Sequence, residues 1–194
     1  MSVLNKIKKP LILIMLGVAV VAYYLYLSNR NDDNTDKMTN NSVVAEYIDR
    51  DMEKNYPGTP RAVVLWYSNM IKAVYEKDLT DEDVKGMAKN LYAMFDDELK
   101  AKNPYDQYVA SVAAEINAYN DAKKIISDFV VEDNVNIEFI TYEGNNYAKV
   151  DVLYYVHEDT KIIKVYHEYT LRKDSKGDWR ILFWEITDSN KMEG

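Results

Sequence analysis

The sequence contains no cysteine and only two histidines, His157 and His167. Without cysteine there is no disulfide, no thiol nucleophile, no thiolate metal ligand and no site for a lipoprotein-type lipid attachment. Two histidines are too few for a histidine-rich metal site. Phosphate-binding loops and serine-centred nucleophile elbows are also missing from the sequence. We therefore expect no metal and no cofactor, and a domain that relies on its hydrophobic core.

Acidic residues are absent from the first 30 positions, where 17 consecutive apolar or aromatic residues run from Leu11 to Leu27. As a helix this run is about 26 Å long, close to the ~30 Å core of a bilayer. Lysines 6, 8 and 9 precede it, and the positive-inside rule places them in the cytoplasm. We predict a basic tail at 1–10, a transmembrane anchor at 11–28, a polar linker at 29–42 and an extracytoplasmic domain at 43–194.

Two alternatives to a permanent anchor stay open. Val20, Val21 and Ala22 form a passable signal-cleavage site, which would release a secreted domain, although the mature chain would then begin with YYLYL. A buried core helix is the other alternative. Unbroken hydrophobicity and the flanking lysines argue against it.

Acidic residues outnumber basic residues after Arg30. All 32 acidic residues follow that position with only 20 of the 24 basic ones, which gives this part a net charge of −12. Nucleic-acid binding requires a basic stripe, and docking onto anionic lipid requires a basic patch. We therefore expect no nucleic-acid partner. Cysteine-free outer domains rich in Tyr, Asn and Lys also suggest a bacterial protein.

Helical periodicity dominates the chain from about residue 42 to residue 120. Helices are predicted to begin near Ser42, after Thr59 with Pro60 in the first turn, after Thr80, where TDED supplies a cap and three acids, and after Asn103-Pro104. From about Ile126 the apolar period changes to two, with turn-rich segments between the strand-like runs. Helices first and strands last predict an α+β domain, with helices packed on one face of an antiparallel sheet.

Turn positions predict the strand registers. A two-residue turn at Gly144-Asn145 pairs Phe139 with Val150, and a turn at Asp159-Thr160 pairs Val152 with His167. With a bulge at Gly177, the last hairpin pairs Leu171 with Ile181 and His167 with Glu185. A four-residue turn would instead put Leu182, Trp184 and Ile186 inside.

The segment YEGNNYAKVDVLYYV…KVYHEYTLRKDSKGDWRILFWE, residues 142–185, resembles the C-terminal sheet of nuclear transport factor two-like domains. The matching features are Ala148-Val150-Val152 on one strand and Gly177-Trp179-Ile181 opening the last, and the likeness extends over about 59–187. It implies a cone-shaped fold with a curved sheet. The anchor-plus-domain architecture is also similar to the inner-membrane assembly subunit of type IV secretion systems. Members of the nuclear transport factor two-like family include enzymes with an Asp, His or Tyr inside the cone, and partner-binding or dimerising domains.

Two sets of site residues follow. An interior pocket is expected from Trp66, Phe139, Val152, His167 and Tyr169, in which His167 and Glu185 are candidates for a general base and its partner. An interface is expected on the opposite sheet face from Tyr142, Tyr147, Tyr155 and Tyr166, because aromatic residues are enriched at protein contacts.

The leading hypothesis is a non-enzymatic, membrane-anchored domain that binds a protein partner or forms a homodimer. The first alternative is a small-molecule-binding or enzymatic cone that uses His167 and Glu185. The second alternative is a subunit of a secretion or conjugation apparatus.

Overall fold

The computed structural model describes residues 41–76 and 79–187. The predicted tail, anchor and linker lie outside these residues, except for Asn41 and Ser42, with which the first described helix begins. Among the described helices, none is both long enough and apolar enough to cross a membrane.

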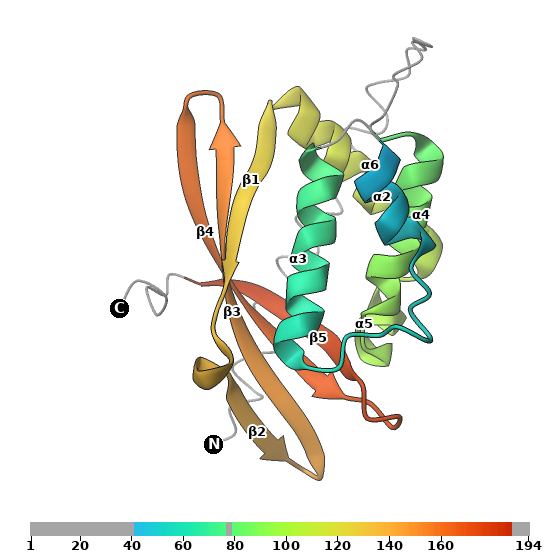
Figure 1. Ribbon diagram of the computed structural model, residues 1–194, viewed down its shortest axis with the longest axis vertical. Helices are drawn as coiled ribbons and strands as arrows, with labels where there is room; N and C mark the ends of the chain where they lie inside the picture. The colour runs from blue at the N-terminus through green and yellow to red at the C-terminus, as the bar shows by residue number, and fades with distance from the viewer. Residues whose placement is uncertain (1–40, 77–78, 188–194) are drawn as a thin grey trace.

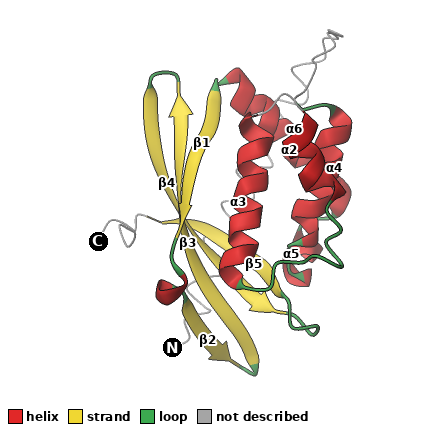
Figure 2. Ribbon diagram, in the orientation of Figure 1, coloured by secondary structure: helices red, strands yellow, loops and turns green. Residues whose placement is uncertain are grey.

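The α+β prediction is confirmed: helices come first and pack on one side of a curved antiparallel sheet (Figures 1 and 2). The helices are α2 (Asn41–Asp49), α3 (Pro60–Glu76), α4 (Asp81–Ala93), α5 (Asp97–Lys102) and α6 (Tyr105–Asp121). The strands are β1 (Lys124–Val131), β2 (Glu138–Tyr142), β3 (Asn145–Glu158), β4 (Lys161–Lys173) and β5 (Trp179–Thr187), with a 3-10 turn, η1 (Asn134–Asn136), before β2.

The long strand β3 organises the sheet, whose order is β1-β3-β4-β5. Its first half pairs with β2 and its second half with β1, so both short strands lie on the same side of β3. Figure 1 shows the β2–β3 hairpin extending away from the helices as an arm. We call residues 138–147 the hairpin arm.

Local sequence explains where the helices begin. The Thr80 hydroxyl accepts a hydrogen bond from the Asp83 backbone N–H, and the Asp83 carboxylate accepts one from the Thr80 backbone N–H, which completes a capping box at α4. Thr59 caps α3 in a similar way by accepting from Ala62 N–H. The Asp96 side chain caps α5, a short helix that was not predicted from the sequence.

Helices α2 and α4 approach closely at Gly86. A Cβ at this position would lie 2.9 Å from Cγ2 of Ile48, so the contact depends on the missing side chain. One turn further along α4, the buried Asn90 amide donates to the carbonyls of Tyr47, Ile48 and Arg50 at the end of α2. Tyr47 and Ile48 lie in the last turn of α2, where carbonyls lack the N–H groups of a following turn, so Asn90 caps the end of this helix.

The core lies between α3, α4 and the inner face of the sheet. Fully buried side chains include Val63, Met70, Met87, Leu91, Val150, Val152, Leu171 and Ile181. The first residues of β5 are held by the segment between α4 and α5, where Ile181 donates to Met94 O at 2.9 Å and accepts from Asp96 N–H at 2.8 Å. This contact joins the helical layer to the sheet edge.

The strand registers are partly as predicted. Every predicted β3–β4 pair is present, including Val152 with His167. The β2–β3 prediction was wrong by two residues: the turn is Glu143-Gly144, with φ of 49° and 78°, and Phe139 faces Ala148. In the last hairpin Leu171 faces Ile181 as predicted. A bulge beyond this pair then places His167 opposite Ile186 and not Glu185.

Candidate functional site: a hydroxyl-lined interior

Three of the five predicted pocket residues lie together on the inner face of the sheet. Val152 on β3 faces His167 on β4, and Tyr169 follows two positions along β4 on the same face. Helix α3 packs over this part of the sheet and brings Ser68 and Tyr67 toward it. The roles assigned to these residues stay predictions.

A chain of hydroxyl groups crosses this interior. Ser68 Oγ lies 2.6 Å from Tyr154 Oη, which lies 2.9 Å from Tyr169 Oη. All three residues are almost fully buried, so the bonds satisfy polar groups that have left water. Burial raises the pKa of Tyr154 to about 12 and that of Tyr169 well above its usual value. At neutral pH both are therefore protonated and act as neutral hydrogen-bonding groups.

Aromatic rings fill the space around these hydroxyls. The Tyr67 ring on α3 contacts Phe95, Tyr169 and Trp184, with centroid distances of 6.1, 5.7 and 6.0 Å. The Phe95 ring also contacts Tyr108 on α6 at 5.1 Å. These rings connect helices α3 and α6 to strands β4 and β5.

His167 borders this cluster, and no described acidic residue is its partner. Its ring lies 5.2 Å from the Tyr154 ring, and its Nδ1 is buried with no hydrogen-bond partner in the described part of the chain. Burial lowers the pKa of His167 to about 4, so the imidazole is neutral at neutral pH. The predicted His167–Glu185 pairing was wrong, because the β5 bulge puts Glu185 opposite Glu168 on the other face of the sheet.

A second polar group, which was not predicted from the sequence, lies beside α6. The Tyr75 ring stacks on Tyr119 at 4.2 Å, and its hydroxyl hydrogen bonds to Glu115. Much of Glu115 is exposed, yet desolvation of its carboxyl group by the surrounding side chains raises its pKa. The available signal was its spacing, because Tyr108, Glu115 and Tyr119 recur at helical intervals on one face.

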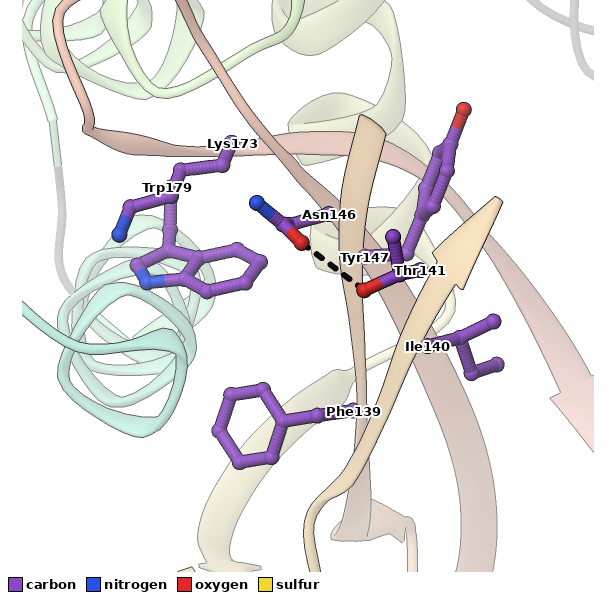
Figure 3. A pocket seen from close by; sticks show the side chains of 7 residues that line it. All are labelled: Phe139, Ile140, Thr141, Asn146, Tyr147, Lys173 and Trp179. Carbon is purple, nitrogen blue, oxygen red and sulfur yellow. Dashed lines mark hydrogen bonds between the residues drawn. The ribbon is translucent and has the colours of Figure 1, made fainter. Parts of the chain in front are cut away.

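The other two predicted pocket residues lie elsewhere. Trp66 is on the side of α3 that faces α2, where its ring meets Tyr47 edge-on at 5.3 Å and carries the Arg50 guanidinium at 3.9 Å. Phe139 is on the hairpin arm and is 60% exposed. The arm and the start of β5 border a small surface pocket of about 140 Å³, which is lined by Phe139, Ile140, Thr141, Asn146, Tyr147, Lys173 and Trp179 (Figure 3).

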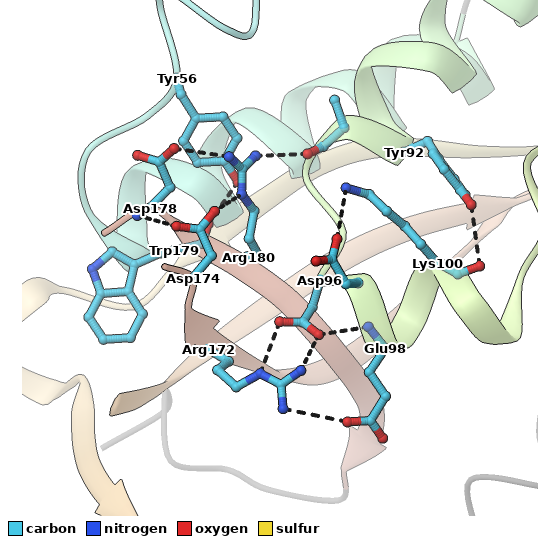
Figure 4. A network of polar contacts seen from close by, with 12 residues as sticks. Tyr56, Tyr92, Asp96, Glu98, Lys100, Arg172, Asp174, Asp178, Trp179 and Arg180 are labelled. Carbon is cyan, nitrogen blue, oxygen red and sulfur yellow. Dashed lines mark hydrogen bonds and ion pairs between the residues drawn. The ribbon is translucent and has the colours of Figure 1, made fainter. Parts of the chain in front are cut away.

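A charged network fixes the lower end of the sheet (Figure 4). The Arg172 guanidinium donates two hydrogen bonds to the buried Asp96 carboxylate. Arg180 donates to Asp174, Asp178 and the Ala93 carbonyl, each at 2.9 Å. Its guanidinium stacks on the Tyr56 ring, whose hydroxyl donates to Trp179 O. These contacts join the helices to β4 and β5, and we interpret them as structural.

The predicted interface tyrosines share the face of the sheet opposite the helices. Tyr147, Tyr155 and Tyr166 alternate with the buried residues of β3 and β4, and Tyr142 follows the same alternation on β2. Tyr142 is 38% exposed and the other three are half-buried. Their use as an interface stays a prediction.

Comparison with known protein families matches residues 1–184 to a domain of unknown function, DUF6715. The chain belongs to this family. A search of curated proteins found no match. The DUF6715 match begins at Met1 and ends within β5, so it includes the apolar run at 11–27 together with all the described helices.

Proposed function

We propose that this DUF6715 protein is a single-pass membrane protein that presents a non-catalytic protein-interaction domain of the nuclear transport factor two-like kind outside the cytoplasm. The observation that carries the proposal is the aromatic cluster of the interior. Tyr67, Tyr169 and Trp184 are in mutual ring contact where a ligand in a cone-shaped fold would lie. A cone filled by its own side chains serves as a scaffold, and the surface then carries the function.

The chemistry of the interior supports a non-catalytic role. The Ser68, Tyr154 and Tyr169 hydroxyls bond one another, and burial keeps both tyrosines protonated. Among the described residues, no acid lies beside His167 to orient the ring or to stabilise a positive charge. General acid–base catalysis needs a group that titrates near the working pH, and these groups titrate far from neutrality.

The sequence and the family match support the anchor. The uncharged run from Leu11 to Leu27 follows three lysines, which favours an N-terminus in the cytoplasm. Because the DUF6715 match covers both this run and the folded domain, the two belong to one family unit. An attached membrane segment agrees with a role in assembly at the membrane surface.

Fractionation of cells that express the full chain tests the anchor. We expect the protein to remain in the membrane after an alkaline carbonate wash, and the folded domain to be digested by protease added outside spheroplasts. A matched variant with Ala19→Lys and Val20→Lys should lose membrane retention, because two charges at the centre of the span oppose insertion. Release of the unchanged chain by carbonate, or protection of the domain from external protease, would contradict the proposal.

Photo-cross-linking in the natural host tests the interaction surface. A photoreactive residue at Tyr155, on the tyrosine face, is expected to give discrete adducts. The same residue at Lys89, exposed on α4, is the control and is expected to give none. Equal labelling from both positions, or no adduct from Tyr155, would count against an interface on this face.

One observation favours a small-molecule-binding cone as a second candidate. His167 Nδ1 is buried without a described partner, and Ile163 and Ile186 are 39% and 65% exposed on the same face of the sheet. A neutral imidazole nitrogen accepts a hydrogen bond, so phenol is a suitable probe. This candidate requires phenol to raise the Tm of the full chain, and His167→Leu to abolish that rise. The similarity to a secretion-system assembly subunit stays a prediction.

A further inference from the structure

The hairpin arm ends in an edge strand with an unusual surface. Strand β2 pairs with β3 alone among the described strands. Its sequence, EFITY, has one charge and otherwise consists of residues that favour strands. Phe139 is 60% exposed and Tyr142 is 38% exposed. Soluble proteins usually protect such edges with charges, proline or a covering element, because open edges recruit further strands.

The register shows which backbone groups point away from β3. The pair that closes a two-residue turn exchanges hydrogen bonds, and here this pair is Tyr142 and Asn145. Bonded and non-bonded pairs alternate along an antiparallel ladder. Ile140 and Glu138 therefore bond to β3, whereas the N–H and C=O groups of Phe139 and Thr141 point outward from the sheet.

We propose that β2 pairs antiparallel with β2 of a second copy of this chain, about a twofold axis at Ile140. This centre places Phe139 of each copy opposite Thr141 of the other, so the outward backbone groups meet and four hydrogen bonds form. It also places Glu138, the single charge of the strand, opposite Tyr142 of the second copy. No like charges face each other across the contact, which favours a second copy over an acidic partner.

The pocket of the arm fits this partner. Thr141, Asn146 and Trp179 line a hollow of about 140 Å³, and the Phe139 ring meets Trp179 at 5.9 Å (Figure 3). In the paired arrangement, Phe139 of the second copy lies opposite Thr141 on the pocket side of the sheet. Insertion of this phenyl ring into the hollow would remove an exposed aromatic side chain from water. Because of the twofold symmetry, each copy would place its Phe139 in the pocket of the other.

This inference names the partner of the proposed interaction domain and therefore rests on that function. The proposed dimer contact is on β2, whereas the predicted tyrosine interface spreads over the face of β3 and β4. Experiments can therefore distinguish the two surfaces. Membrane fractionation reports the anchor, photo-cross-linking at Tyr155 reports the tyrosine face, and the following disulfide test reports β2 pairing alone.

The absence of cysteine makes a disulfide test direct, because each introduced thiol is the only one in the chain. Because the backbone groups of Ile140 point toward β3, the two copies of Ile140 would face each other as a non-bonded pair. The Cα atoms of such a pair lie about 4.5 Å apart, within the range of a disulfide. Ile140→Cys in the full-length chain, oxidised in the membrane of the expressing cell, should therefore give a covalent dimer. Tyr142→Cys is the matched control, since the two copies of position 142 would lie about 14 Å apart.

Co-expression of two different cysteine variants tests the register between the two copies of β2. Glu138→Cys and Tyr142→Cys should each give no disulfide-linked dimer when expressed alone, and should form the mixed disulfide-linked dimer when co-expressed. The expected result is several-fold more dimer from Ile140→Cys, and from the mixture, than from either control. Equal cross-linking of Ile140→Cys and Tyr142→Cys would overturn the proposal.

A proline variant separates pairing from folding. The Thr141 N–H points away from β3, so Thr141→Pro removes a bond to the second copy and keeps the ladder to β3. In the Ile140→Cys chain, Thr141→Pro should reduce the dimer several-fold with an unchanged circular dichroism spectrum. Thr141→Val, which removes the hydroxyl bond to Asn146 and keeps the N–H, should leave the dimer yield unchanged. Undiminished cross-linking in a folded Thr141→Pro variant would also overturn the proposal.

Discussion

Strand β3 passes through two regions that differ in what covers them. In the region beneath the helices, Ala148, Val150 and Val152 are fully buried. In the hairpin arm, Phe139 and Tyr142 are exposed to 60% and 38%. Both regions have strand-forming sequences and a regular ladder, so hydrogen bonding does not distinguish them. The covered region gains its stability from burial, and the arm leaves apolar surface exposed.

The largest expected effect compares the same substitution in the two regions. Phe95 is 1% exposed and contacts the rings of Tyr67 and Trp184, whereas Phe139 is 60% exposed. Phe95→Ala should lower the free energy of unfolding by about 4 kcal/mol, because it leaves a cavity in the aromatic cluster. Phe139→Ala should lower it by less than about 1 kcal/mol. Urea unfolding measures both, and similar losses would refute the distinction.

The Asp96–Arg172 pair should be the next most costly feature to remove. Asp96 is 4% exposed, caps α5 and accepts two bonds from Arg172. Asp96→Ala should cost about 3 kcal/mol, because it removes the cap and leaves a partly buried guanidinium with a poorer partner. Asp96→Asn keeps a capping side chain and should recover about 1 kcal/mol of that loss. Thermal unfolding that gives equal losses for Ala and Asn would exclude the cap as a contributor.

The hydroxyl chain predicts a coupled pair of smaller effects. Tyr154→Phe leaves both Ser68 and Tyr169 without this partner and should cost about 2 kcal/mol. Tyr169→Phe leaves Tyr154 bonded to Ser68 and should cost about 1 kcal/mol. The double variant should cost less than the sum of the two. Additive losses in the cycle would show that the hydroxyls do not act as one chain.

His167 predicts a loss of stability in mild acid. Its pKa falls from 6.5 in the unfolded chain to about 4 in the folded protein, so the unfolded state binds the proton more tightly. The free energy of unfolding is therefore unaffected by protonation of His167 above pH 6.5, and it decreases as the pH falls from 6.5 toward 4. His167→Phe should flatten the stability profile in this window. An unchanged slope in urea titrations would contradict a buried neutral imidazole.

Glu115 should act with the opposite sign. Its pKa is raised above 4.5 on folding, so its contribution is present at low pH and lost as the pH rises through the folded value. Glu115→Gln should therefore stabilise the protein slightly at pH 7, and should have a smaller effect in acid. A destabilised Gln variant at pH 7 would show that the ionised carboxylate is favourable beside Tyr75.

The turn of the arm predicts a further small effect. Gly144 has a φ of +78°, and an added Cβ would meet nothing within 4 Å. Gly144→Ala should therefore cost only the backbone strain, about 1 kcal/mol. Glu143→Asn, at a φ of 49°, should be neutral or slightly stabilising. A loss well above this for Gly144→Ala would mean that the arm contributes more to stability than its exposure suggests.

The sequence predicted the parts of the fold that local rules decide. Thr80 and Thr59 mark the starts of α4 and α3 because capping chemistry is local. The β3–β4 register was correct because two long alternating strands meet at one short turn. The β2–β3 register was off by two because Glu143, not only Gly144, adopts positive φ. An even shift keeps every side chain on its face, so the predicted inner and outer faces of this hairpin hold.

The candidate site was predictable only in part. Val152, His167 and Tyr169 were placed together correctly by strand alternation. The bulge in β5, which separates His167 from Glu185, has no marker in the sequence. Trp66 was misplaced because both sides of α3 are apolar, one facing the sheet and one facing α2. The partnership of Tyr75 with Glu115 joins two helices, and helix packing cannot be read from either helix alone.

Hydrogen exchange on the full-length chain, at a low and a high protein concentration, tests the difference between the two regions most directly. Amides of Val150 and Tyr169 should be strongly protected at both concentrations, because they lie in the covered ladder. Amides of Phe139 and Thr141 should exchange rapidly in the dilute sample and more slowly in the concentrated one, as β2 pairs with a second copy. Equal protection of Phe139 and Thr141 at both concentrations would contradict an arm that is open in the single chain and closed by its partner.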